Sequence, residues 1–167
     1  MKEISPKELS KETFSKYGSY YNMQSPKGIC LGDSSCKFFH DRVSMYLSSE
    51  IVGFSVMQTE KKDGIIDELE YHDHTCEALL PMDGDVYMQV APASGKDAVP
   101  YSQLEVFRIP KGTLVTLRPG VWHAGAFCRD KNSVNILVVL PERCYGTDCT
   151  IVKLPEDQKV KILYAEK

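Results

Sequence analysis

The residues best suited to chemistry lie in two short segments of this chain. The segment 71–77 contains His72, His74 and Glu77, and His123 follows a Pro-Gly pair much later. Side chains two residues apart on a β-strand point to the same face. If 71–77 is extended, His72 and His74 therefore point into one space, where His123 could complete a cage. Three imidazoles and one carboxylate suit Zn, Mn, Fe, Co or Ni, so the pattern predicts a divalent transition-metal site without choosing the metal.

A His-x-His pair alone is more often a pair of ordinary surface or core residues than a pair of metal ligands. Here Glu77, Gly84 and the later Pro-Gly-x-x-His segment agree with a metal site through spacings that are independent of the pair. Cys76 lies between two of the expected ligands, but nothing indicates a lowered thiol pKa. We interpret Cys76 as a small buried residue rather than a nucleophile.

The elements that must position these residues are short strands separated by Gly and Pro turns. A helix is expected before them, with Ser5 as N-cap, Pro6 in the first helical position, Glu8 completing a capping box and Gly18 as the stop. The strand-like segments are 51–58, 67–74, 78–82, 86–90, 104–109, 113–117, 122–127 and 133–140, with 149–154 as a further candidate. With no repeat or second domain, this order predicts one all-β domain over residues 1–167, a β-sandwich or barrel.

Composition excludes several classes of function. The chain has 167 residues, a formal net charge of −3 and no long basic cluster, which argues against a nucleic-acid partner. No apolar run approaches the roughly 20 residues that span a bilayer. The six cysteines form no CxxC pair, and the first residues lack the apolar stretch of a signal peptide. We therefore expect free thiols and a cytoplasmic protein.

The two segments resemble the motifs of the cupin superfamily. The first cupin motif joins a glycine, a His-x-His pair, a glutamate and a second glycine, and this chain offers His72, His74, Glu77 and Gly84. The second motif contains Pro-x-Gly-x-x-His, which the segment ending at His123 matches with the proline displaced by one position. The resemblance implies a cupin-like jelly-roll β-barrel with a short N-terminal helix. It also implies a homodimer.

A closer resemblance, over most of the chain, is to the ureidoglycolate lyase family of allantoin degradation. It rests on Glu68-Leu69-Glu70-Tyr71-His72, on the segment 77–86 and on Val121-Trp122-His123. The family commonly has glutamine at the position of Glu77 and an apolar or aromatic residue at that of His74. The resemblance implies cleavage of ureidoglycolate, or a similar small hydroxy-carboxylate, to glyoxylate and urea in the parent reaction.

Three residues are candidates for catalysis beside the metal. Glu77, or Glu70 nearby, could relay a proton, and the guanidinium of Arg118 could hold a substrate carboxylate bidentately. The plainer interpretations are a solvated carboxylate for Glu70 and an exposed charge at a strand end for Arg118. Rival functions are a metal-dependent sugar or sugar-acid isomerase, a dioxygenase if the metal is redox-active iron, and a non-catalytic small-molecule-binding cupin.

Overall fold

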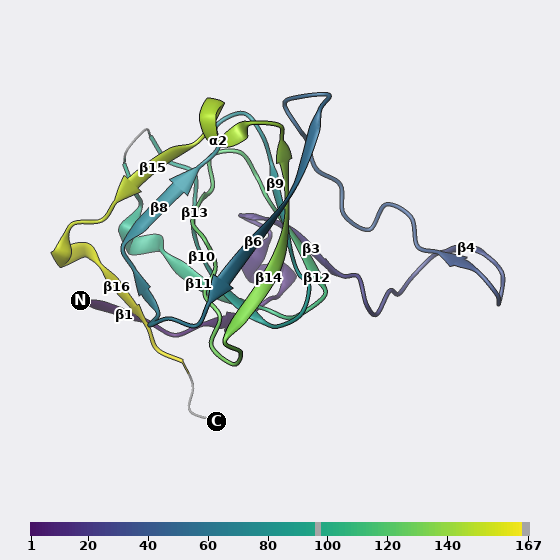
Figure 1. The fold of residues 1–167 in the computed structure, drawn as a ribbon, viewed down its shortest axis with the longest axis horizontal. Helices are drawn as coiled ribbons and strands as arrows, with labels where there is room; N and C mark the ends of the chain where they lie inside the picture. Colours follow the sequence, from purple (N-terminus) through teal and green to yellow (C-terminus); the bar gives the residue numbers. More distant parts are fainter. Residues whose placement is uncertain (96–97, 165–167) are drawn as a thin grey trace.

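The computed structural model describes residues 1–95 and 98–164, and its two large β-sheets face each other (Figure 1). One sheet has six strands, in the order β15 (Thr150–Lys153), β8 (Glu68–Tyr71), β13 (Trp122–His123), β10 (Val86–Ala91), β11 (Glu105–Ile109) and β2 (Lys7–Glu8). The other has five, in the order β3 (Gly18–Asn22), β12 (Thr113–Leu117), β9 (Glu77–Pro81), β14 (Ser133–Pro141) and β6 (Val52–Glu60).

Smaller elements complete the fold. A three-stranded sheet contains β1 (Lys2–Ile4), β16 (Val160–Ile162) and β7 (Ile65–Ile66), and a hairpin contains β4 (Leu31–Gly32) and β5 (Lys37–Phe38). The helices are α1 (Lys11–Phe14) and α2 (Cys144–Thr147), with single 3₁₀ turns η1 (Tyr101–Gln103) and η2 (Glu156–Gln158). No helix in the described part of the chain is long and apolar enough to cross a membrane.

The alternation of residues along the strands explains the two layers. On β14, Val134, Ile136 and Val138 are buried in the core between the sheets, together with Met88 and Val90 of β10. A second apolar cluster lies on the opposite face of the six-stranded sheet, where β16 covers it. Both faces of the six-stranded sheet are therefore covered, and β10 has buried residues on each side, Met88 and Val90 on one and Ala91 on the other.

The predicted all-β jelly-roll class is confirmed, with one refinement. Among the described residues the two large sheets share no strand, so the domain is a two-sheet jelly-roll sandwich rather than a barrel closed by continuous strand pairing. Edge strands such as β6 and β15 therefore remain.

The predicted N-terminal helix begins later than expected. Ser10, not Ser5, is the N-cap of α1, and its hydroxyl accepts a hydrogen bond from the Thr13 amide at 3.2 Å. Lys7 and Glu8 instead form β2, which pairs in parallel with β11. The Arg108 guanidinium donates to the Glu8 carboxylate at 3.2 Å, so tertiary pairing outweighs the local capping signal.

Residues 23–50 form an arm between β3 and β6. The arm carries the β4–β5 hairpin and projects away from the sandwich on the side of the five-stranded sheet (Figure 1). It is anchored near its ends, where the Met23 amide donates to Gly112 and the Cys76 amide donates to Tyr46.

Candidate metal centre

Three of the predicted ligands meet between the two sheets. His72 follows the last residue of β8, His123 lies on β13, and Glu77 is the first residue of β9 on the opposite sheet. His123 Nε2 lies 2.6 Å and His72 Nε2 lies 3.5 Å from Glu77 Oε2. All three residues are only 3% exposed. One ligand atom of each lies within 4.8 Å of the others, an arrangement that could hold a metal ion.

The backbone of the Pro119-Gly120 turn holds the His72 loop in place. Gly120 has φ +77°, a left-handed conformation that favours glycine. Its amide donates to the carbonyl oxygen of His72 at 2.7 Å. The turn thus fixes the backbone of one ligand three residues before it delivers another, His123.

Both imidazoles are oriented by their second nitrogen. His72 Nδ1–H donates to the carbonyl of Asp148 at 2.5 Å, and His123 Nδ1–H donates to the carbonyl of Val121 at 2.8 Å. A carbonyl oxygen can only accept a hydrogen bond, so Nδ1 carries the proton in each ring and Nε2 points to the opposite side of the ring. These Nε2 atoms and Glu77 Oε2 are buried and meet only one another. Such orphaned atoms, with backbone-oriented imidazoles, are what a metal-binding histidine pair requires.

The charges of the cluster are strongly coupled. Burial would raise the pKa of Glu77, but the neighbouring His123 and His72 outweigh it and lower this pKa to about 2. Burial would lower the pKa of His123, but the Glu77 carboxylate outweighs it and raises this pKa to about 9. The pKa of His72 is also raised, since Glu77 and Asp148 outweigh burial and the charge of His123. Near neutral pH the metal-free cluster is therefore an ion pair between Glu77 and His123.

The fourth predicted ligand, His74, lies outside the cluster. The expectation that His72 and His74 alternate on one strand was wrong, because β8 ends at Tyr71 and an irregular loop follows. The side chain of His74 is 78% exposed, and its Nδ1 lies 3.3 Å from Asp148 Oδ1. The amides of Asp73 and His74 both donate to the Asp148 carboxylate, at 2.8 and 2.9 Å. That carboxylate caps the loop and turns His74 toward solvent.

The two other predicted catalytic residues have different surroundings. Glu70 is paired directly with His123 across β8 and β13, so both side chains lie on the same face of the sheet. Its carboxylate accepts a hydrogen bond from Cys149 Sγ at 3.2 Å. The Arg118 guanidinium instead donates to the carbonyl of Ser15, the C-cap of α1, at 2.5 Å. The structure brings Glu70 to the edge of the cluster but gives Arg118 a partner on the helix.

The segment around α2 supplies residues that the sequence did not single out. Asp148 holds the His72 ring and the following loop, as described above. The ring of Tyr145 lies edge-on to His72, 6.2 Å between centroids, and Cys144 Sγ is 3.5 Å from His72 Nδ1. Burial and the charges of Glu77 and Glu70 raise the pKa of the Tyr145 hydroxyl. These residues carry no recognisable motif, so only the fold could reveal them.

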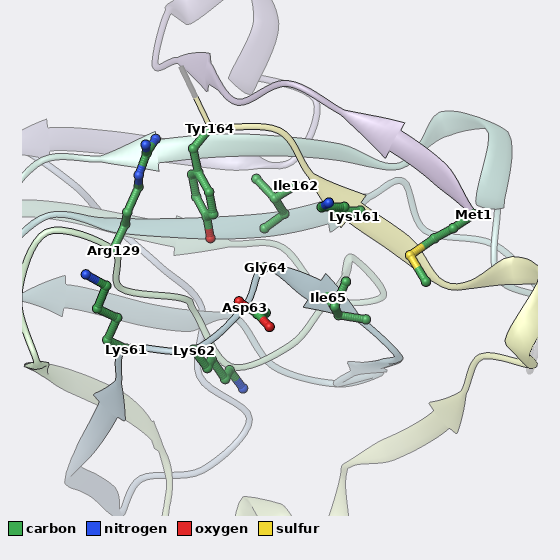
Figure 2. A pocket seen from close by; sticks show the side chains of 10 residues that line it. All are labelled: Met1, Lys61, Lys62, Asp63, Gly64, Ile65, Arg129, Lys161, Ile162 and Tyr164. Atoms are coloured by element: carbon green, nitrogen blue, oxygen red, sulfur yellow. The ribbon is translucent and has the colours of Figure 1, made fainter. Parts of the chain in front are cut away.

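A separate cavity of about 540 Å³ lies beside β7 and β16 (Figure 2). Figure 2 shows Tyr164, Arg129 and Lys61 around it, and no ligand of the cluster lines it. This cavity is therefore a different site from the cluster of His72, Glu77 and His123.

Comparison with known proteins adds a family to this geometry. A protein-family model described as ureidoglycolate lyase matches residues 1–161. The chain belongs to the ureidoglycolate lyase family. Ureidoglycolate lyases of Escherichia coli (strain K12 / DH10B) and Shigella boydii serotype 18 are each 24% identical over 153 residues, which cover 90% of this chain and 93% of the relative. Among solved structures, a dTDP sugar isomerase from Desulfovibrio desulfuricans G20 is 12% identical with a TM-score of 0.47, covering 77% of this chain and 81% of that chain.

Proposed function

We propose that this protein is a metal-dependent lyase that cleaves ureidoglycolate, or a similarly small hydroxy-carboxylate, with glyoxylate and urea as the products from ureidoglycolate. The family supports the substrate class. The observation that carries the metal dependence is the buried set of His72 Nε2, His123 Nε2 and Glu77 Oε2, which have no partners beyond one another.

His72, Glu77 and His123 would hold the metal, a divalent ion of the Zn, Mn, Fe, Co or Ni group. When bound, such an ion supplies Lewis acidity, which lowers the pKa of water from 15.7 to about 7 in favourable sites and acts likewise on a hydroxyl group. Three protein ligands leave coordination positions for small molecules. His74 is not needed for this site.

The reaction moves one proton from oxygen to nitrogen. The substrate hydroxyl loses its proton as its carbon–oxygen bond becomes the carbonyl of glyoxylate. The carbon–nitrogen bond breaks, its electron pair stays on nitrogen, and the departing urea takes up a proton. A single carboxylate can accept the first proton and return it in the second step.

Glu70 is the residue that we assign to this relay. It lies on the same sheet face as His123 but is not among the three metal-ligating residues. Glu77 is less suited, because its Oε2 faces both imidazoles and its pKa of about 2 makes it a weak base. Tyr145, whose ring centroid lies 6.2 Å from that of His72, borders the cluster on the α2 side.

Metal analysis combined with a urea-release assay tests the proposal. Purified protein reconstituted with each candidate metal should retain on the order of one ion per chain after dialysis. The metal-loaded protein should then release urea and glyoxylate from racemic ureidoglycolate. Failure to retain any metal would overturn the metal site. Retention of metal without urea release would overturn the lyase and favour the isomerase or binding function.

A further inference from the structure

The cavity beside β7 and β16 has the dimensions of a small-molecule site. Its volume of about 540 Å³ lies within the range of known ligand pockets. Three segments that are distant in the sequence supply most of its lining: residues 61–65, Arg129 and residues 161–164. β16 and β7 form an antiparallel pair, and the Ile162 amide donates to the carbonyl of Gly64 at 2.7 Å. Backbone hydrogen bonds therefore hold the walls of this cavity in place.

The lining of this cavity is strongly cationic. It contains Lys61, Lys62, Arg129 and Lys161 but only one carboxylate, that of Asp63. The whole chain has a net charge of −3, so positive charge is concentrated here against the overall balance. Cations around a concave surface focus a positive potential into it and raise the local concentration of anions. The cavity therefore favours an anionic ligand.

The three lysines of the lining form no ion pair with any carboxylate in the described part of the chain. Elsewhere the structure pairs lysines closely: the ammonium groups of Lys7 and Lys16 each lie 2.5 Å from the carboxylate of Glu105. Charge-assisted hydrogen bonds from ammonium groups to phosphate or carboxylate oxygens are among the strongest in proteins. The lysines of the cavity can therefore direct these bonds to a bound anion without first breaking an ion pair with a described residue.

Tyr164 adds a buried hydrogen-bond donor to the wall. Its hydroxyl oxygen is buried and has no hydrogen-bond partner among the described residues. Burial and the nearby Tyr87 raise the pKa of Tyr164 to about 12, so the hydroxyl stays protonated near neutral pH and can donate. Gly64 leaves room for it, since a Cβ at that position would lie 2.7 Å from the hydroxyl oxygen. A buried donor without an acceptor is unfavourable, and an oxygen of a bound anion would supply the acceptor.

We propose that this cavity is a second ligand site, which binds a small organic dianion, either a phosphate monoester or a dicarboxylate. Figure 2 shows Arg129 and Lys61 on one side of Tyr164 and Lys161 on the other, so cationic groups border the cavity from two sides. The guanidinium carbon of Arg129 lies 4.8 Å from the centre of the Tyr164 ring.

The balance of charges in the lining favours a dianion over a monoanion. Its cations outnumber its carboxylate by more than one, so a single negative charge would leave most of the excess unbalanced. The apolar side chains of Ile65 and Ile162 also line the cavity and would contact the carbon skeleton of the ligand. The site lies apart from His72, Glu77 and His123, so the proposal depends neither on the metal nor on the lyase reaction.

Isothermal titration calorimetry of the full chain tests the proposal, with glycerol 1-phosphate and succinate as the two dianionic probes. At low salt, at least one of them should bind one site per chain with a Kd below about 1 mM. Acetate, with one charge, and glycerol, with none, should bind at least about tenfold more weakly. The probe that binds identifies the ligand as a phosphate or a dicarboxylate. If neither probe binds, the proposal is overturned.

Two variants assign the binding to this cavity. Lys61→Gln/Lys161→Gln should weaken binding of the same probe at least about tenfold, because it removes two charge-assisted hydrogen bonds. Both side chains are exposed, so the circular dichroism spectrum should not change. Tyr164→Phe removes only the hydroxyl group and should weaken binding about fivefold. Unchanged affinity in the lysine variant would overturn the site, and unchanged affinity in Tyr164→Phe would overturn the role of the hydroxyl.

Lys11→Gln/Lys37→Gln is the matched control. It removes the same number of positive charges from two exposed lysines that do not line the cavity. This variant should bind the probe with wild-type affinity. An equal loss of affinity in both lysine variants would show that net charge, not the cavity, governs binding, and would overturn the proposal. These outcomes are independent of the urea-release assay.

Discussion

At the scale of single residues, the cluster depends on which side-chain atoms remain free once others have formed hydrogen bonds to the backbone. The Nδ1–H groups of His72 and His123 are used by Asp148 and Val121, so their Nε2 atoms turn to Glu77. Three potential metal-ligating atoms therefore share one buried space, whereas His74 is turned outward by the Asp148 carboxylate.

Alanine substitutions should distinguish the three histidines of the two motifs by their effect on metal binding. His72→Ala and His123→Ala are each expected to abolish stoichiometric metal binding, because two remaining ligands do not form a stable site. His74→Ala should retain the metal and most of the activity, since its exposed ring lies outside the cluster. Element analysis of the three purified variants checks this expectation. Loss of metal in His74→Ala would contradict the three-residue site.

Removal of the Glu70 carboxylate should affect turnover but not metal content. We expect Glu70→Gln to lower kcat about 100-fold, the typical contribution of a positioned general base. Glu68→Gln is the control, because Glu68 is an exposed carboxylate on the same strand. Equal activity of the two variants would show that Glu70 is only a solvated charge.

The buried ion pair predicts a particular pH dependence for metal-free protein. The pKa of His123 is raised from 6.5 to about 9, so its stabilisation is complete below pH 6.5 and is lost as the pH rises through 9. The pKa of Glu77 is lowered from 4.5 to about 2, so its stabilisation is present above pH 4.5 and is lost as the pH falls toward 2. Thermal unfolding of chelator-treated protein should give the highest Tm between pH 4.5 and 6.5. A Tm that does not fall between pH 6.5 and 9 would contradict the pairing.

At the scale of elements, the turn between β12 and β13 and the segment around α2 hold the ligands from two sides. Gly120 is held at φ +77° with its amide on His72, and Asp148 binds both the His72 ring and the loop after it. Neither element contributes a ligand atom. Both determine where the ligand atoms lie.

Gly120→Ala should therefore impair both stability and metal binding. A left-handed alanine costs about 1–2 kcal/mol, and its Cβ would lie 3.0 Å from the Cβ of Ala93. Gly146→Ala is the control, because an added Cβ there has open space and the φ of Gly146 is not positive. Urea denaturation and metal titration of both variants test this prediction. Equal stability of the two would contradict the role of the turn.

At the scale of the whole molecule, the cluster links the two large sheets. His72 and His123 belong to the six-stranded side, and Glu77 begins a strand of the five-stranded sheet. A bound metal would therefore act as a crosslink between layers that share no strand.

Metal removal should consequently lower the stability of the sandwich as a whole. Free metal at 100 times its Kd stabilises the folded state by about 2.7 kcal/mol, and a chelator removes this contribution. The Tm of wild-type protein should fall on chelation, and His40→Ala should show the same fall, because His40 lies in the arm and contacts Asp41. If chelation left the Tm of metal-loaded wild-type protein unchanged, the result would argue against a crosslink between the sheets.

The local pattern was sufficient for much of the sandwich. The predicted strands 51–58, 86–90, 104–109, 113–117 and 133–140 correspond to β6, β10, β11, β12 and β14 within two residues, because alternation or apolar continuity reflects burial directly. Short strands such as β1, β7 and β16 were missed. Two or three residues carry no periodicity, and these strands exist only through their partners.

The sequence by itself determined the all-β class and the residue types of a metal site, because strand alternation and the His and Glu spacings are local properties of the chain. Only the tertiary structure decided which of those residues meet. His72, Glu77 and His123 come from three different strands or strand ends, whereas His74 is only two residues from His72 yet faces solvent. The physical reason is that β8 ends at Tyr71: beyond it the two-residue period no longer applies, and hydrogen bonds from Gly120 and to Asp148 set the direction of each side chain.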